Sequence, residues 1–243
     1  MIQLARALAI SRKDVESYYG KPPLVTWGLL FPAVLILAVY IKDRAGYLDV
    51  APGIIAMTLL FGNTSMAAIV ITFEKRSGTF ERLLLSPLGM GTIILGKALS
   101  AAAYGIATSI VLAVGLKACM GLPMARPDVF IAGLLIGSCV FSLLGLIASV
   151  MVKEVFEAMT LMNFFRFPLL FLSGVFVPFA QMPGWLKPVA WLSPLTHAGE
   201  MIRFGIFGET AFASPWVPVA ASLIMFAAVC VLSGLSFQRY ARR

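Results

Sequence analysis

Six long apolar runs restrict the fold of this chain more than any other feature. They cover residues 24–41, 51–73, 93–116, 129–152, 158–179 and 217–237. A helix needs about 20 apolar residues to cross a bilayer, a length that most of these runs reach. Only 12% of the residues are charged, whereas soluble domains contain about 25%. The sequence therefore predicts an all-α, polytopic membrane protein with six transmembrane helices, built as a single domain of residues 1–243.

The N-terminal segment, residues 1–21, has a different pattern. Its apolar and basic side chains are spaced as on an amphipathic helix: Leu4, Leu8 and Val15 against Arg6, Arg12 and Lys13. This favours a helix lying in the membrane interface over a soluble arm, and the basic residues argue against a cleavable signal peptide. The first apolar run begins after Pro22-Pro23, and Pro32 within it predicts a kink.

The stretch 181–215 is too rich in proline for a full span and too apolar for an ordinary loop. We expect short re-entrant or interfacial helices there, with Trp185 and Trp191 at the level of the lipid headgroups. His197, Glu200 and Arg203 follow at helical spacing. They could form a weak catalytic cluster, but no nucleophile accompanies them. A polar face on an interfacial helix is the favoured interpretation.

Basic residues are unevenly divided between the two sides of the predicted membrane domain. Thirteen of the 19 lysines and arginines fall on the side that holds both termini. Because loops rich in Lys and Arg stay in the cytoplasm, both termini are predicted to be cytoplasmic. Topology thereby accounts for the net charge of +8, without nucleic acid as a partner.

Residues Gly91–Ala98 have the spacing of a phosphate-binding P-loop. However, Ala98 stands where a magnesium-binding Ser or Thr is required, and no strand is expected before it. Lys97 is better interpreted as snorkelling from the edge of the third span.

The three cysteines lack metal-binding or redox spacing. The spans hold almost no ionisable residues, so an ion-coupled carrier is disfavoured and the energy source is expected outside the bilayer.

Arg166 is the exception, since it lies within the fifth span. We favour a side chain that snorkels to the cytoplasmic headgroups. The alternative is a side chain that faces an inner cavity and attracts an anionic group.

On the fourth span, small residues recur four apart, in the pairs Gly133/Gly137 and Gly145/Ser149. Such pairs predict close helix packing, either within one chain or between two.

The segment Glu74–Pro87, after the second span, is the most informative polar stretch. It carries charges of both signs, then Phe80 and three leucines, and it ends at a proline. A plain connector needs no such apolar residues. They are typical of a short surface helix that offers apolar side chains to a cytoplasmic partner.

The whole chain resembles the membrane (permease) subunits of type-2 ATP-binding-cassette (ABC) exporters. Residues 74–87, EKRSGTFERLLLSP, are similar to the family pattern E-R-x-x-G-T-x-E-R-L-L-x-x-P. The fifth span ends in LSGVFVP (172–178), and MPGWL (182–186) and LSPLT (192–196) follow, as in the outer re-entrant region of that family. Arg166 departs from the apolar run that is usual at its position.

The resemblance implies that residues 74–87 form a coupling helix, which docks on a separate ABC ATPase subunit. ATP and magnesium would bind to that partner, and this chain would bind no cofactor or metal. The residues implied in coupling are Glu74, Lys75, Arg76, Gly78, Thr79, Phe80, Glu81, Arg82, Leu83, Leu84 and Pro87.

The resemblance also implies a dimer of permease chains, most simply a homodimer, surrounded by membrane lipids. Alternating access would occur at a dimer interface lined by the second and fifth spans. The implied substrate pathway comprises Asn63, Met66, Asn163, Arg166, Phe167 and Phe171, and the implied outer gate comprises Ser173, Gly174, Phe176 and Pro178.

The expected function is outward movement of an amphipathic or lipid-linked substrate, such as a drug, lipid or glycolipid, across a prokaryotic cytoplasmic (inner) membrane. Two other functions remain open. One is a membrane-embedded enzyme that acts on a lipid, and the other is an ion-coupled carrier.

Overall fold

The computed structural model describes residues 2–44, 46–177 and 179–241, and this part of the chain contains helices and turns but no strand. The elements are α1 (Ile2–Tyr18), α2 (Pro22–Val25), a π-helical turn (Thr26–Leu30), α3 (Phe31–Lys42), α4 (Tyr47–Arg76), α5 (Thr79–Leu84), α6 (Met90–Met120), α7 (Pro127–Met151), α8 (Val155–Leu172), a 3-10 turn (Phe179–Gln181), α9 (Lys187–Trp191), α10 (Pro194–Phe207) and α11 (Trp216–Ala241).

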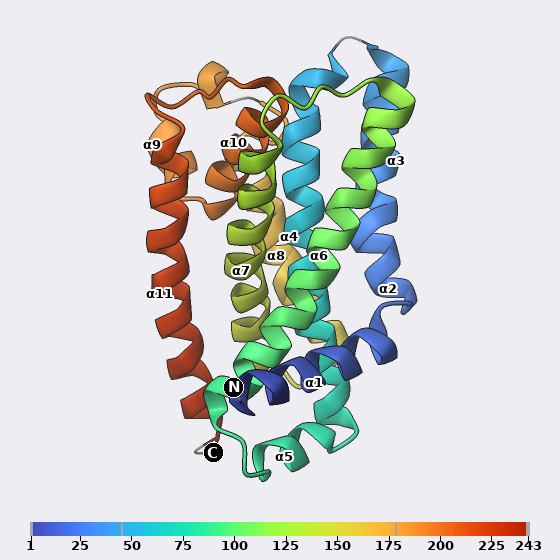
Figure 1. The fold of residues 1–243 in the computed structure, drawn as a ribbon, viewed down its shortest axis with the longest axis vertical. Coiled ribbons are helices and arrows are strands. Elements are labelled where there is room, and N and C mark those ends of the chain that lie inside the picture. Colours follow the sequence, from blue (N-terminus) through green and yellow to red (C-terminus); the bar gives the residue numbers. More distant parts are fainter. Residues whose placement is uncertain (1, 45, 178, 242–243) are drawn as a thin grey trace.

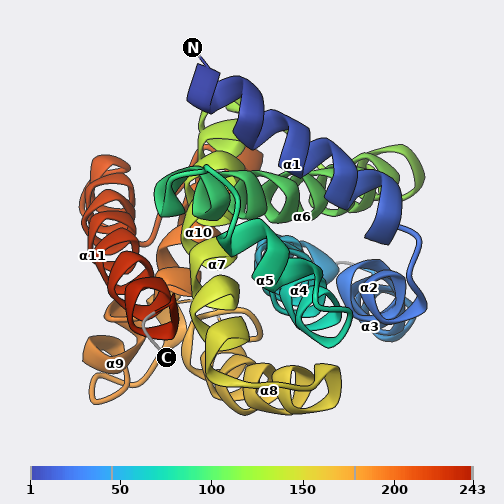
Figure 2. The same ribbon diagram turned by 90° about the horizontal axis from the view of Figure 1, so that it is seen from below.

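The long helices run side by side along one axis and alternate in direction (Figure 1). Both termini lie at one end of the bundle, together with α1 and α5, and we call this the basal end. The opposite, distal end carries α9, α10 and the link between α6 and α7. Seen from below, α1 lies across α6, and α8 and α11 are at the periphery (Figure 2).

Local sequence signals account for several helix ends. Pro127 occupies the first turn of α7, where its missing N–H costs nothing. Glu154 and Glu157 form a capping box at the start of α8. The chain leaves α6 through Gly121, whose φ of 74° is the left-handed conformation that glycine tolerates.

Within the described residues, five helices are long and apolar enough to cross a membrane: α4, α6, α7, α8 and α11. They correspond to the second through sixth predicted spans, so the chain is a multi-pass membrane protein. The first predicted span is the shorter segment Thr26–Lys42, which begins with the π-helical turn. Pro32 is the second residue of α3, which follows this turn, and a local π turn is one way for a helix to adjust to the hydrogen bond that a proline removes.

α4 lies at the centre of the bundle, and its most apolar stretch is buried along its whole length. Close contacts with α7 explain this position. An added Cβ at Gly145 would lie 2.8 Å from Ala67 and 2.9 Å from the Thr64 backbone. Gly133 and Gly137 similarly approach α10 within the same chain. The small residues of the fourth span therefore serve packing inside one chain.

The distal segment differs from the sequence prediction in two respects. α8 ends at Leu172, before the predicted boundary at 179, because Gly174 adopts a φ of 86° and turns the chain. α10 carries the predicted polar residues His197 and Glu200, but both are buried rather than displayed on an interfacial face. The physical reason is that α10 packs among α4, α7 and α11.

Candidate functional site: the basal coupling segment and the buried arginine

Residues 74–87, called the coupling segment after the role that the resemblance implies, contain the predicted short helix, α5, at the basal end of the bundle (Figure 1). Gly78 precedes α5 with a φ of 66°, a left-handed conformation that suits glycine. The hydroxyl of Ser77 bonds to that of Thr79 and donates to the Glu74 carbonyl at 3.1 Å. These contacts fold the chain back sharply after α4 and hold α5 beneath it.

Phe80 is buried in this structure, so it is not one of the apolar side chains offered to a partner. Its ring packs 6.4 Å from Phe237 and 5.8 Å from Tyr240, measured between ring centroids. Of the three leucines that were also expected to be offered, Leu85 is the exposed one, at 87%. Phe80 thus joins the coupling segment to the last helix, α11.

The remaining residues implied in coupling are divided between the surface and the bundle. The exposed ones are Arg76, Thr79, Glu81, Arg82 and Pro87, whereas Lys75, Gly78, Leu83 and Leu84 are half-buried. Lys75 donates hydrogen bonds to the carbonyls of Ser149 at 2.7 Å and Val152 at 3.0 Å. It thereby satisfies free carbonyls at the end of α7.

Glu74 belongs to a buried network of four charged side chains, which joins α1, α4 and α6. Lys97 lies 2.6 Å from Glu74 and 2.9 Å from Asp14. The side chains of Lys97, Asp14 and Glu74 are 1%, 0% and 2% exposed. Lys13, 48% exposed, pairs with both carboxylates. The two positive and two negative charges balance, as buried charges require.

This environment shifts the pKa of the Asp14 carboxyl. Burial raises its pKa, and the neighbouring Lys97 opposes that rise. The Ser100 hydroxyl also donates to Asp14, at 3.3 Å. Lys97 consequently holds α1 against α6, and the prediction that it snorkels to the membrane edge is wrong.

Gly96 permits α1 and α6 to approach closely. An added Cβ there would lie 2.9 Å from the Ala7 carbonyl and 2.9 Å from the Ile10 side chain. Residues Gly91–Ala98 form the start of the continuous helix α6, so they provide no loop to wrap a phosphate. Their glycine and lysine instead bind the N-terminal helix.

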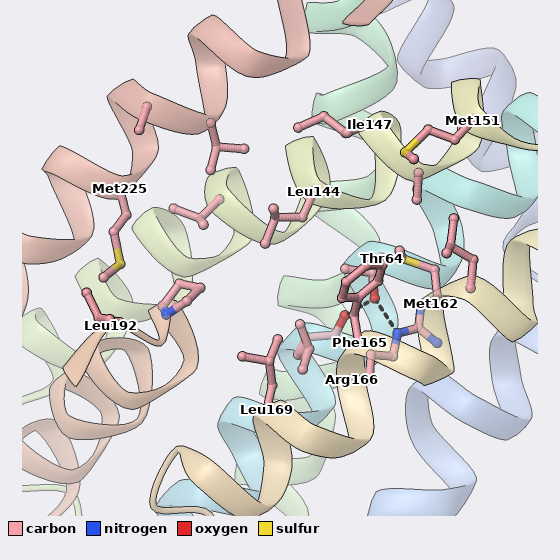
Figure 3. A pocket seen from close by; sticks show the side chains of 17 residues that line it. Thr64, Leu144, Ile147, Met151, Met162, Phe165, Arg166, Leu169, Leu192 and Met225 are labelled. Atoms are coloured by element: carbon pink, nitrogen blue, oxygen red, sulfur yellow. Dashed lines mark hydrogen bonds between the residues drawn. The ribbon is translucent and has the colours of Figure 1, made fainter. Parts of the chain in front are cut away.

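Arg166 is buried between α8 and α4 (Figure 3). Its guanidinium donates to Thr64 at 2.8 Å, to Ser65 at 3.0 Å and to Asn163 at 3.3 Å. It also lies 4.8 Å from the centre of the Phe61 ring. The prediction of a snorkelling side chain is therefore wrong, because α4 supplies partners within the bundle.

No carboxylate in the described part of the chain pairs with Arg166. Its positive charge is held by hydroxyl and amide dipoles and by an aromatic face. A buried, uncompensated charge is costly, and residues of this kind within spans commonly have a functional role.

The other residues implied in a substrate pathway do not share one surface. Asn63 and Met66 are buried, and Asn63 forms hydrogen bonds of 3.2 Å with Ser138 and Ser142 of α7. Phe167 and Phe171 are exposed on α8, and Asn163 is half-buried beside Arg166. Among these other implied pathway residues, those on α8 thus reach the surface, whereas those on the enclosed α4 do not.

The implied outer gate folds back on the distal part of α4. Ser173 is buried and its hydroxyl bonds to that of Ser193. After Gly174, the Val175 backbone lies 2.5 Å from where a Cβ on Gly53 would be. The Phe176 ring lies 5.5 Å from Phe171. Pro178 lies outside the described residues.

Sequence reasoning missed the basal network. Asp14 and Lys97 stand 83 positions apart, and no sequence motif links them. The one available signal was that two acidic residues, Asp14 and Glu16, stand among the basic residues of the N-terminal helix.

Comparison with known proteins agrees with this architecture. The model of the ABC-2 type transporter family matches residues 6–207. Similar proteins include the probable multidrug ABC transporter permease YbhR of Escherichia coli (strain K12), 30% identical over 63% of this chain and 42% of YbhR. The inner membrane transport permease YadH of the same strain is 27% identical over 77% of this chain and 75% of its own length.

Nodulation protein J of Rhizobium leguminosarum bv. viciae is also similar, being 27% identical over 74% of this chain and 67% of its own length. The chain spans about two-fifths of the length of YbhR. The family match, in contrast, covers most of the chain and includes both α5 and the buried Arg166. This chain therefore belongs to the ABC-2 type transporter family.

Proposed function

We propose that the chain is the permease half of an ABC exporter, which moves an amphipathic or lipid-linked substrate outward by using a separate ATPase subunit. The observation that carries the proposal is the family match over residues 6–207, together with a coupling segment that stands out at the basal end. YbhR and YadH, two of its relatives, are named as transport permeases.

In the proposed topology the chain crosses the membrane six times. The first crossing is the broken segment Pro22–Lys42, which runs beside α4, and the others are the five long helices. An even number of crossings agrees with the position of both termini at the basal end (Figure 1). The excess of Lys and Arg at that end supports a cytoplasmic location for it, which would put α10 in the outer half of the membrane.

Coupling would use the exposed side of α5. Glu81, Arg82 and Leu85 are exposed there, and they offer the ATPase one apolar contact flanked by both charge signs. A displacement of α5 would be transmitted to α11 through Phe80, and to α4 through the turn at Gly78. The charged network around Glu74 would transmit the same displacement to α1 and α6.

A second permease chain would face the exposed aromatic stripe of α8. Phe164, Phe167 and Phe171 are exposed at positions that share one helix face. Because α4 is enclosed, it would reach a dimer interface only after α8 moves, and such a movement would uncover Arg166. This provides an alternating-access step in which the buried cation becomes available to substrate.

The test is reconstitution with the partner ATPase. Leu85→Asp, or charge reversal at Glu81 and Arg82, should reduce ATPase binding and permease-stimulated ATP hydrolysis by at least fivefold. Leu85→Met is the matched control, because it keeps an apolar side chain at the same exposed position. The proposal would be refuted if the chain recruits no ATPase, or if Leu85→Asp and both charge reversals couple as well as Leu85→Met.

A further inference from the structure

An apolar groove runs between α7, α8 and α11 (Figure 3). Its cavity has a volume of about 440 Å³, within the range usual for ligand pockets. The groove is lined by apolar residues apart from Thr64 and Arg166, whose polar groups bond to each other. Met151 and Phe165, on its rim, are exposed, so the groove is open to the surroundings of the bundle.

A second cavity, of about 780 Å³, lies at the basal end between α4, α5, α11 and the link from α7 to α8. Lys75, Arg76 and Lys153 line it, opposite Glu81 and Glu154. Arg239 lines an adjoining cavity that shares Val150, Met151 and Tyr240 with it. We call these two cavities together the basic cleft.

The basic cleft has more positively than negatively charged side chains. Arg76, Lys153 and Arg239 are exposed, and within the described residues none of the three forms an ion pair. Glu154 is already engaged in capping α8. Four cations thus face two carboxylates, and one carboxylate has a partner of its own. The cleft is complementary to an anionic group.

The groove and the cleft are adjacent, since Met151 lines both. The groove follows α7 from Met151 back to Val140, a rise of about 16 Å at 1.5 Å per residue. This is about half of the hydrocarbon thickness of a bilayer, that is, one leaflet. An amphipath with its charge in the cleft would therefore have one leaflet's depth of apolar surface beside it.

We propose that these two adjacent cavities together bind one anionic phospholipid, with the headgroup in the basic cleft and an acyl chain in the apolar groove. Basic pockets between helices on the cytoplasmic side are suited to anionic headgroups. The assignment to the cytoplasmic leaflet depends on the proposed topology, but not on the identity of the transported substrate. Glu81 and Leu84 of α5 form part of the cleft wall, so the bound lipid would also contact the coupling segment.

Native mass spectrometry of the purified chain tests the proposal. Phosphatidylglycerol and phosphatidylcholine with identical acyl chains are titrated separately, and phosphatidylglycerol should bind at least tenfold more tightly. The double variant Lys153→Gln/Arg239→Gln should weaken phosphatidylglycerol binding about 30-fold, since each basic side chain near a membrane surface contributes about fivefold. Phosphatidylcholine binding should not change. Lys42→Gln/Lys117→Gln removes two exposed charges at the distal end and is the matched control.

A second pair of variants tests the groove. Ala228 is exposed and lines it, so Ala228→Trp should fill it and weaken binding of both lipids. Ala102→Trp fills the neighbouring cavity of about 350 Å³, whose lining has no charged residue, and should leave binding unchanged. Equal affinity for the two lipids, or equal effects of a variant pair and its control, would overturn the proposal. So would dimer loss in Ala228→Trp with unchanged lipid binding, because a second chain would then occupy the groove.

Discussion

Replacement of Lys97 by methionine should release α1 from the bundle. The variant removes the buried cation from Asp14 and Glu74, whose side chains are 0% and 2% exposed, and leaves only Lys13, which is 48% exposed. Loss of one partner of a buried ion pair typically costs about 3–5 kcal/mol. Methionine is apolar and similar in length, so the cost arises mainly from the carboxylates left without their partner.

The effect should be local, because α1 contacts chiefly α6. Hydrogen exchange of α1 amides in nanodiscs measures this opening directly. A cost of about 3–5 kcal/mol corresponds to a loss of protection of about two to four orders of magnitude. Arg12→Met is the control, since it removes an exposed pair with Glu16, 83% and 62% exposed, which is worth at most about 1 kcal/mol.

Adding Glu74→Gln to Lys97→Met leaves Lys13 and Asp14 as a balanced pair, so it should restore at least half of the lost protection. The reasoning is refuted if Lys97→Met and Arg12→Met have the same protection in α1. It is also refuted if the double variant is less protected than Lys97→Met alone.

Three further predictions concern packing and the buried arginine. Gly96→Val should separate α1 from α6 and lower α1 protection as Lys97→Met does, whereas Gly91→Val, in open space on the same helix, should leave it unchanged. Phe80→Ala empties a fully buried site, so it should cost about 3–5 kcal/mol; thermal unfolding should show a drop that Leu85→Ala lacks. Arg166→Met removes an unpaired buried charge and should keep or raise the unfolding temperature while export falls at least tenfold. A lower unfolding temperature with normal export would show that Arg166 is purely structural.

The sequence alone determined the helical spans, their order and the short surface helix α5. These features depend on local patterns: apolar runs long enough for a bilayer, and glycine and proline at the ends of α5. Five spans and α5 are found where these patterns predict them. The first span was harder to predict, because Pro32 and the preceding turn leave a helix of marginal length.

Only the tertiary structure decided where the charged side chains go. Lys97 and Arg166 could each have snorkelled to the membrane surface, and their own helices do not exclude it. Lys97 meets Asp14, 83 residues away, and Arg166 meets Thr64, 102 residues away. A long basic side chain stays buried only where a neighbouring helix supplies oxygen atoms at the same depth. Which helix lies beside it is a property of the packed bundle, set largely by the glycines that allow close approach.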